Sequence, residues 1–250
     1  MKALITGASS GIGREMARDL AERGYDLILV ARRLDRLEAL KEELGGVKVR
    51  CISCDLSKEE ECYSLYEQVK SENIDMLINN AGFGAFGYFD EMDLSRELEL
   101  INTNIKAVHI LTKLFLKDFI KRDSGNILNT GSIAGFMMGP LLSSYYSSKH
   151  YVVSLTEAIY EELRRKKSNV KVSVLCPGPV QTEFFDVAKV RFIIAGQKPE
   201  FVAKYAIKKA LKGKLLIIPG FLTKLGVFAT RFAPRKLLAR ILFKVQKLRM

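Results

Sequence analysis

The chain has 250 residues, of which 48% are hydrophobic and 27% are charged, and its formal net charge is +12. This length and composition suit one α/β domain with a sizeable core and an appendage. Cys51-x-x-Cys54 has no second pair and only two histidines exist, which argues against a metal site or a disulfide framework and favours free thiols. No apolar signal segment precedes the first expected strand, so we expect a cytoplasmic protein.

The positive charge is concentrated at the C-terminus. Residues 201–250 contain thirteen of the 40 Lys and Arg residues and no Asp or Glu, whereas residues 1–200 contain 27 basic and 28 acidic side chains. An affinity for anions is therefore expected of the C-terminal segment and not of the preceding body.

A glycine-rich turn follows the first expected strand. Residues 2–5 are mostly apolar, Gly7, Gly11 and Gly13 come next, and a helix is expected over 14–23. Glycines allow a backbone to approach a pyrophosphate, which the N–H groups and dipole of the helix then stabilise. The spacing differs from the general G-x-G-x-x-G pattern. Its place at the first strand of an alternating β/α pattern nevertheless predicts a nucleotide site.

A second strand is expected over 26–30, and Ala31, Arg32 and Arg33 follow it. An NAD-binding unit usually places an acidic residue near this point to bind the ribose 2′-hydroxyl. Arginine instead matches a phosphate with two parallel hydrogen bonds, which favours a 2′-phosphate. In the alternative interpretation, the two arginines are solvated charges at the start of a helix.

The remaining pattern alternates strands with helices. Each expected strand is almost continuously apolar, as in a parallel sheet that is covered on both faces. We therefore predict seven parallel strands with helices on both sides, and ligands outside the carboxyl ends of the strands. The further strands are expected over 47–52, 75–78, 126–129, 171–175 and 214–218, and the further helices over 58–71, 94–119 and 145–166.

Two polar features of the expected helices point to chemistry. Tyr145 and Lys149 are four residues apart and so share one helix face, where a cation would lower the pKa of the phenol. A pair at this spacing is also common on ordinary helix faces. Asn104 is unfavourable in mid-helix and requires partners if it is buried, either as a structural group or as part of a polar site.

Several motifs together resemble the classical short-chain dehydrogenases/reductases over residues 2–220. They are Thr6-Gly7-x-x-x-Gly11-x-Gly13, Asn79-Asn80-Ala81-Gly82, Ser132, Tyr145-x-x-x-Lys149 and Pro177-Gly178. The resemblance implies a Rossmann-like α/β fold, a nicotinamide cofactor, and hydride transfer between that cofactor and an alcohol or carbonyl carbon.

The resemblance also implies catalytic roles. Tyr145 would be the general acid in reduction, and Lys149 would lower its pKa and bind the nicotinamide ribose. Ser132 would polarise the substrate carbonyl, and Asn104 would hold a water that links Lys149 to solvent. Tyr146 competes for the role of Tyr145, but only Tyr145 has the four-residue step to Lys149.

The resemblance implies NADP(H) as the cofactor, because Arg32 matches the position that binds the 2′-phosphate. Ser10 departs from the pattern, since NADP-dependent members often have a basic residue there. The remaining implied contacts are Gly7, Ser9, Gly11, Ile12 and Gly13 with the pyrophosphate, Asp55 and Leu56 with the adenine, Asn80, Ala81 and Gly82 with a ribose, Val180 and Thr182 with the carboxamide, and Pro177 and Gly178 in the same site.

Two apolar stretches bear on the substrate. Residues 184–197 take the place of the family's substrate loop, and 136–138 follow Ser132. Both favour a hydrophobic ketone, aldehyde or 3-oxoacyl substrate. The same side chains are equally compatible with core or oligomer contacts, since methionines fill irregular gaps as readily as they line pockets.

Residues 221–250 form an extension to the predicted catalytic domain, 1–220. Within it, residues 234–249 place Leu and Ile at a helical period and Lys and Arg on other faces, which predicts a basic amphipathic helix. This helix is too short and too charged to span a bilayer. It would lie on an anionic membrane, on its own body or on a partner subunit.

The first hypothesis is therefore an NADPH-dependent carbonyl reductase, and the resemblance implies that it forms a homo-oligomer through the long helices after the fourth and fifth strands. The alternative is a nucleotide-binding regulatory or scaffold protein that has lost the chemistry. Its signature would be a broken set of catalytic residues, and this set is intact. A nucleic-acid binder is disfavoured, because the basic tail lacks a known reading motif.

Overall fold

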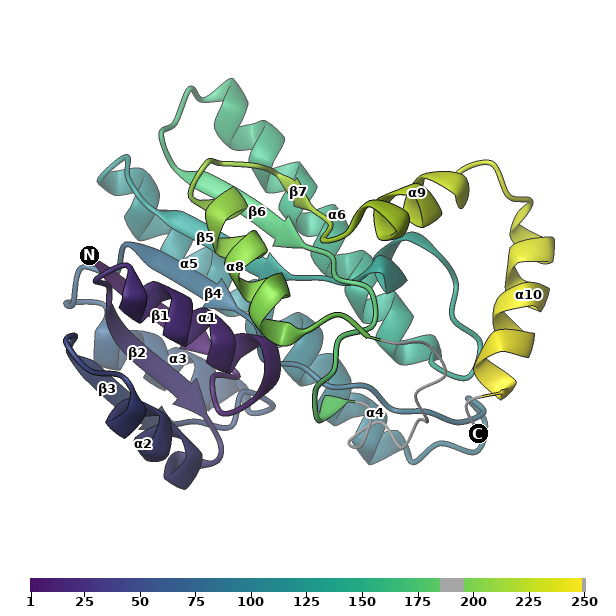
Figure 1. Cartoon of the computed structure of the whole chain (residues 1–250), viewed down its shortest axis with the longest axis horizontal. Coiled ribbons are helices and arrows are strands. Elements are labelled where there is room, and N and C mark those ends of the chain that lie inside the picture. Colours follow the sequence, from purple (N-terminus) through teal and green to yellow (C-terminus); the bar gives the residue numbers. More distant parts are fainter. Residues whose placement is uncertain (185–195, 249–250) are drawn as a thin grey trace.

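The computed structural model describes residues 1–184 and 196–248, and its centre is one sheet of seven parallel strands. The strand order, β3-β2-β1-β4-β5-β6-β7, confirms the predicted parallel sheet and its Rossmann-like topology (Figure 1). The strands are β1 (Lys2–Thr6), β2 (Asp26–Ala31), β3 (Val49–Ser53), β4 (Met76–Asn79), β5 (Asn126–Thr130), β6 (Lys171–Leu175) and β7 (Leu216–Ile217).

Helices cover both faces of the sheet, as predicted (Figure 1). The structure adds α8 and α9, which the sequence pattern did not identify. The helices are α1 (Gly11–Glu22), α2 (Leu34–Glu43), α3 (Glu59–Val69), α4 (Leu94–Ile101), η1 (Asn102–Ala107), α5 (Val108–Lys121), η2 (Ile133–Phe136), α6 (Ser143–Arg165), α8 (Pro199–Ala210), α9 (Phe221–Ala229) and α10 (Arg235–Lys247).

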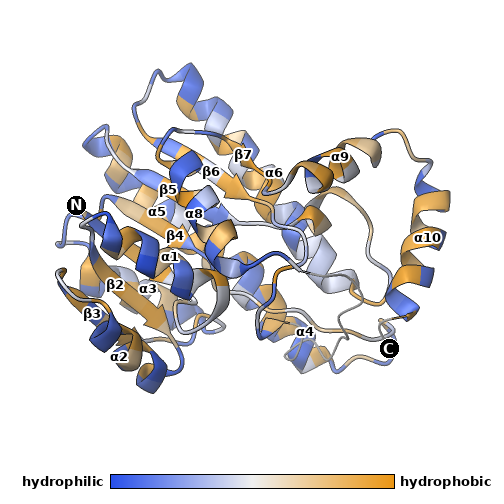
Figure 2. Ribbon diagram, viewed as in Figure 1, coloured by the Kyte–Doolittle hydropathy of each residue, from blue (hydrophilic) through white to orange (hydrophobic). Residues whose placement is uncertain are grey.

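The core consists of two main layers, because successive side chains of a strand point to opposite faces. Ala3 and Ile5 of β1 pack with residues of α1, α2 and α8, while Leu4 packs with residues of α3, α5 and α6. Figure 2 shows the result as apolar strands between helices that have one apolar and one polar side. The continuously apolar strands are thus explained by burial on both faces.

The prediction of one continuous helix over 94–119 is wrong, although the segment is helical throughout. It divides into α4, a π-helical turn η1 and α5. Such turns are rare and often occur at functional sites. Here the turn contains Asn104, which is fully buried and whose side chain contacts a neighbouring loop instead of solvent.

The functional end of the sheet lies at the carboxyl ends of β1 and β4. Strand order reverses at this point, since β2 and β3 follow on one side and β4 to β7 on the other. In open parallel sheets, a crevice for ligands forms there. Within residues 1–184 and 196–248, no helix is long and apolar enough to cross a membrane, and no cluster of three or more His, Cys, Asp or Glu side chains is arranged to hold a metal ion.

Candidate active site

The glycine loop between β1 and α1 has no room for side chains at its key positions. Gly7 and Gly11 have φ angles of +65° and +55°, in the left-handed region that favours glycine. A Cβ on Gly13 would lie 2.4 Å from the carbonyl oxygen of Gly7. The loop therefore requires glycine, and it forms a cradle of backbone at the start of a helix, which suits a pyrophosphate.

Asn79 and Asn80 at the end of β4 face different partners. The Asn79 side chain is buried, and its Nδ2 donates to Asn129 Oδ1 at 2.9 Å. The Asn80 Nδ2 instead donates to the carbonyl oxygens of Thr6 and Gly7, each at 3.2 Å. The Thr6 hydroxyl oxygen also accepts from the Asn80 backbone N–H at 2.9 Å. Asn79 thus joins two strands, while Asn80 fixes the glycine loop.

The loop opens into a cavity of about 440 Å³ that runs along the carboxyl ends of the strands. Nearly all predicted site residues line it, although residues 7 and 182 are far apart in sequence. Gly13 and Asn104 do not line the cavity and lie behind its wall. The predicted residues in the lining are Gly7, Ser9, Gly11, Ile12, Arg32, Asp55, Leu56, Asn80, Ala81, Gly82, Ser132, Tyr145, Lys149, Pro177, Gly178, Val180 and Thr182.

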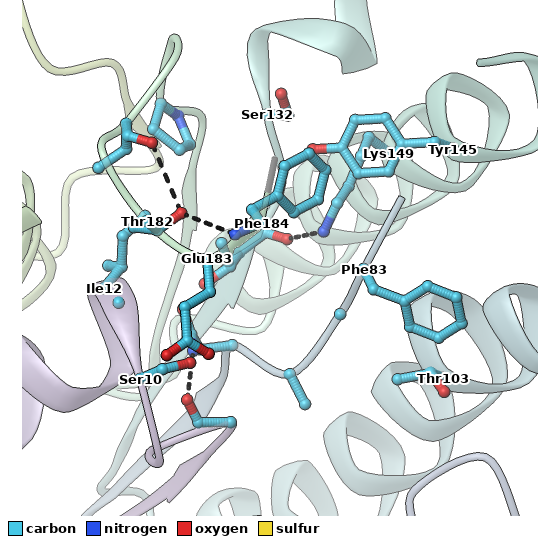
Figure 3. Close-up of a pocket in the computed structure, with 18 of the residues that line it drawn as sticks. Ser10, Ile12, Phe83, Thr103, Ser132, Tyr145, Lys149, Thr182, Glu183 and Phe184 are labelled. Atoms are coloured by element: carbon cyan, nitrogen blue, oxygen red, sulfur yellow. Dashed lines mark hydrogen bonds between the residues drawn. The ribbon is translucent and has the colours of Figure 1, made fainter. Parts of the chain in front are cut away.

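Ser132, Tyr145 and Lys149 meet in the middle of this cavity (Figure 3). Ser132 follows β5, and its hydroxyl oxygen accepts from the backbone N–H of Ala134 at 3.1 Å, which fixes the rotamer. The Lys149 Nζ donates to the carbonyl oxygen of Thr130 at 2.8 Å and lies 5.8 Å from the centre of the Tyr145 ring. A phenol, a hydroxyl and an ammonium therefore surround one space.

The pKa of Tyr145 moves opposite to the sequence-based prediction. Burial disfavours the phenolate and raises this pKa, and the hydrogen bond with Ser132 opposes the rise only in part. Burial also lowers the pKa of Lys149 to about 8. Burial of the phenol thus outweighs any lowering in this structure, and the part of Lys149 in lowering this pKa stays a prediction. Tyr145 is consequently a protonated phenol, which is the form that donates a proton.

Asn104 contacts the loop after β4. Its Oδ1 accepts from the backbone N–H of Phe83 at 3.1 Å, and its Nδ2 donates to the Phe83 carbonyl oxygen at 3.0 Å and to Ser148 Oγ at 3.1 Å. The side chain therefore holds the loop that carries Gly82 against α6. Its predicted role in holding a water beside Lys149 stays a prediction.

Both arginines at the end of β2 line the cavity and are paired with carboxylates. Arg32 lies 3.0 Å from Glu99. Arg33 lies 3.1 Å from Glu183 and 3.3 Å from the hydroxyl oxygens of Ser9 and Ser10 in the glycine loop. Both arginines were noted after the strand in the sequence, but only Arg32 was predicted as a site residue, since the contact of Arg33 with residue 183 depends on tertiary structure.

Aromatic side chains define the other end of the cavity. Phe83, Tyr146 and Phe184 line it, and the ring centres of Phe184 and Tyr145 are 5.1 Å apart (Figure 3). Sequence reasoning assigned no role to Phe83. The predicted substrate loop lies largely outside the described residues, because its residues 185–195 are not described. Phe184 nevertheless places an apolar surface next to the catalytic phenol.

The four cysteines all lie within the described residues, and one of them, Cys54, lines the cavity. All are free, which confirms the prediction of free thiols. Burial raises the pKa of Cys54 to about 12 and that of Cys51 to about 11. Both thiols therefore stay protonated and weakly reactive at neutral pH.

Comparison with known proteins agrees with this geometry. The family model for short chain dehydrogenases matches residues 1–189. The chain belongs to the short-chain dehydrogenase/reductase family. It is 37% identical to an uncharacterized oxidoreductase of Staphylococcus saprophyticus over 73% of this chain and 75% of the relative. It is 34% identical to a farnesol dehydrogenase of Aedes aegypti over 72% and 78% of the two chains.

Solved structures of the family extend the likeness to almost the whole fold. A short-chain dehydrogenase from Sphingobium yanoikuyae in complex with NADPH is 29% identical, with a TM-score of 0.85 and 94% of each chain covered. A member from Burkholderia phymatum in complex with NAD is 26% identical, with a TM-score of 0.83 and 90% and 91% of the two chains covered. Members of this family thus bind either nucleotide on the same fold, and this chain is an oxidoreductase of that family.

The residues present fit such a nucleotide. The glycine loop offers a backbone cradle that a single Cβ would fill, and Thr130 Oγ1 in the cavity wall is buried without a hydrogen-bond partner among the described residues. Gly7 and Gly11 would hold the pyrophosphate, Asp55 and Leu56 the adenine, and Lys149 the nicotinamide ribose. The nicotinamide supplies or accepts a hydride when it is bound.

Proposed function

We propose that this protein is an NADP(H)-dependent oxidoreductase that reduces the carbonyl group of a hydrophobic substrate, or oxidises the corresponding alcohol. The observation that carries this proposal is the convergence of Ser132, Tyr145 and Lys149 in a cavity whose one end is a glycine loop and whose other end is aromatic.

The chain's own residues suit a reduction. A substrate carbonyl between Ser132 and Tyr145 accepts a hydrogen bond from each hydroxyl, which stabilises the negative charge that develops on its oxygen. The Tyr145 Oη then donates its proton to that oxygen, and the phenolate that forms lies near the Lys149 ammonium. Because the pKa of Lys149 is about 8, the ammonium form predominates at neutral pH.

The two arginines support a preference for NADP(H) over NAD(H). Arg32 and Arg33 line the cavity after β2, where an NAD-specific protein usually has an acidic residue. Their ion pairs with Glu99 and Glu183 are exposed, and exposed pairs contribute little to stability. A doubly charged 2′-phosphate is therefore able to replace a carboxylate as their partner.

The aromatic end of the cavity supports a hydrophobic ketone, aldehyde or 3-oxoacyl compound as the substrate. Burying apolar groups of a substrate against the rings of Phe83, Tyr146 and Phe184 favours binding. The similarity to a farnesol dehydrogenase agrees with an apolar alcohol or carbonyl compound.

A panel of hydrophobic ketones, aldehydes and 3-oxoacyl thioesters, assayed with NADPH and with NADH, tests the proposal. We expect turnover of at least one class, with a higher kcat/KM for NADPH. Cofactor binding without any turnover would favour the scaffold alternative instead.

The cofactor preference has its own test in Arg32→Asp. A carboxylate at this position repels a 2′-phosphate and removes a charge-assisted partner, so KM for NADPH should rise about 10- to 100-fold while KM for NADH changes little. Arg36 does not line the cavity, although it also pairs with Glu183, so Arg36→Gln serves as a control. Equal effects of Arg32→Asp on both nucleotides would refute the assignment.

A homo-oligomer and a cytoplasmic location also belong to the proposal. Leu94, Leu98 and Ile101 form an exposed apolar stripe on α4, at the i, i+4, i+7 spacing of one helix face. Self-association through α4, α5 and α6 would bury this stripe. Sedimentation of the wild type and of Leu98→Glu tests it, and an unchanged mass of the variant would contradict this interface.

A further inference from the structure

The two helices after β7 combine positive charge with exposed apolar side chains. The sequence after Gly220 contains eight Lys or Arg residues and no Asp or Glu. In Figure 1, α9 and α10 lie at one end of the molecule, away from β1 to β3. In Figure 2, both helices carry orange apolar segments beside blue ones.

The helix α9 packs against the body with one side and presents an apolar stripe on the other. Val227 is buried, whereas Phe221, Leu225 and Phe228 are 78%, 54% and 55% exposed. At 100° per residue, these three residues lie within about 60° of one another around the helix, and Val227 lies about 130° away from them. Lys224 is exposed and flanks the stripe.

The helix α10 has the same arrangement. Its inner side contacts the body, because Gln246 is buried and its Nε2 donates to the Tyr146 hydroxyl oxygen at 2.8 Å. Leu237 and Ile241 lie on the outer side and are about half exposed, at 51% and 49%. Exposed basic side chains at 240, 244 and 247 flank them on one edge. The predicted amphipathic helix thus makes a polar contact with the body of the protein and presents its apolar stripe to solvent.

Charge decides which partner this surface fits. Packing α9 and α10 of one copy on those of another would bring like charges together, and residues 1–200 hold 27 basic against 28 acidic side chains, so the body has a net charge of only −1 with which to receive the tail. An anionic lipid bilayer instead offers both a negative surface and an apolar layer beneath it.

We propose that α9 and α10 form a peripheral docking surface for anionic lipid bilayers. The apolar stripes enter the boundary between headgroups and acyl chains, and the flanking basic side chains contact lipid phosphates. This surface adjoins the active site, because Gln246 of α10 bonds to Tyr146, whose ring lies 6.0 Å from that of Tyr145. Docking therefore brings the aromatic end of the cavity close to the lipid, where an apolar substrate would be concentrated.

Co-sedimentation of the full chain with vesicles tests this docking surface. We expect binding to mixed phosphatidylcholine and phosphatidylglycerol vesicles that decreases as salt is added, and little binding to phosphatidylcholine alone. Replacing Arg240, Lys244 and Lys247 by Gln should weaken the binding on the order of 100-fold, since each basic residue near an anionic surface contributes a several-fold gain.

A matched variant separates the docking surface from total charge. Three exposed lysines lie at the C-terminal ends of α5, α6 and α8, near the amino ends of the strands: Lys121, Lys166 and Lys212. Replacing these three by Gln removes the same charge from another part of the molecule. This variant should bind the vesicles as the wild type does. A second variant, Leu225→Ser with Ile241→Ser, should keep the fold and the charge but lose most of the binding.

Three results would overturn the proposal. The first is an absence of binding to the anionic vesicles, and the second is an equal loss of binding in both triple-Gln variants. The third is a drop in molecular mass caused by Leu225→Ser with Ile241→Ser while vesicle binding persists, which would show that a second copy covers the stripes. Turnover of a water-soluble carbonyl compound should stay unchanged in all these variants, so failure of docking is distinguishable from failure of the proposed enzymatic function.

Discussion

The two ends of the active-site cavity are built in different ways. The cofactor end combines backbone and short side chains at strand ends with Arg32 and Arg33, and bonds such as those from Asn80 to the carbonyl oxygens of Thr6 and Gly7 hold its glycine loop. The substrate end consists of aromatic rings from separate segments, Phe83, Tyr146 and Phe184, and it borders α10. In the proposed function, the first arrangement binds the nucleotide that carries the hydride. The second would select the substrate by its shape and apolar area.

Lys149 lies at the junction of the two ends, and its burial has the largest expected effect on stability. Its pKa is about 8 in the folded chain and 10.5 in water. Between these pH values the unfolded chain binds a proton that the folded chain does not, so this group makes stability rise with pH by about 3 kcal/mol in total. Below pH 8, the burial of the charged Lys149 lowers the free energy of unfolding by this full amount.

Urea unfolding of the wild type and of Lys149→Met at pH 7.5 and pH 10.5 measures this effect. The difference between the two proteins isolates Lys149, because the cysteines and tyrosines titrate in both. We expect the difference to shift in favour of the wild type by about 3 kcal/mol as the pH rises. Parallel pH profiles would show that Lys149 is not desolvated as described.

The cofactor end should tolerate almost no added volume. In Gly13→Ala, the new methyl group would meet Gly7 O at 2.4 Å and Asn80 Nδ2 at 2.5 Å, so the variant should lose about 2 kcal/mol of stability and bind nucleotide weakly. Gly45→Ala is the control, since a Cβ there has no neighbour within 4 Å among the described residues. Thermal unfolding and nucleotide titration check both, and equal behaviour of the two variants would contradict the tight cradle.

The substrate end should respond more mildly. Removing the ring of Phe184 takes away an apolar wall beside Tyr145, and we expect kcat/KM for a hydrophobic carbonyl compound to fall about tenfold in Phe184→Ala, with nucleotide binding unchanged. Phe89 is 68% exposed and does not line the cavity, so Phe89→Ala should have no effect. A loss in nucleotide affinity in Phe184→Ala would show that the two ends are not separable.

Features that depend on short stretches of sequence were predicted well. The seven strands were predictable because burial on both faces leaves almost continuous apolar runs, as in β1. The glycine loop and the Tyr145–Lys149 pair were also predictable, since their chemistry depends on short spacings. Each of these signals is local in the sequence.

Other features were hidden because they depend on contacts between distant segments. The π-helical turn forms where Asn104 contacts Phe83, and nothing in residues 102–107 alone demands it. The raised pKa of Tyr145 follows from burial, which spacing does not reveal. Arg33 meets Glu183 across 150 positions of sequence. Sequence patterns thus pointed to the groups that meet in the cavity, while their electrostatic environment required the structure.

The central claim is that Tyr145 supplies the proton in an oxidoreductase reaction. Turnover of the best carbonyl compound from the substrate panel, measured with NADPH in Tyr145→Phe and Tyr146→Phe, tests it most directly. We predict that Tyr145→Phe lowers kcat by about 10²- to 10⁴-fold while the Kd for NADPH stays within about twofold, as expected for loss of a general acid. Tyr146→Phe should lower kcat less than about tenfold, since that hydroxyl bonds to Gln246. Wild-type turnover in Tyr145→Phe, or an equal loss in Tyr146→Phe, would contradict the assignment.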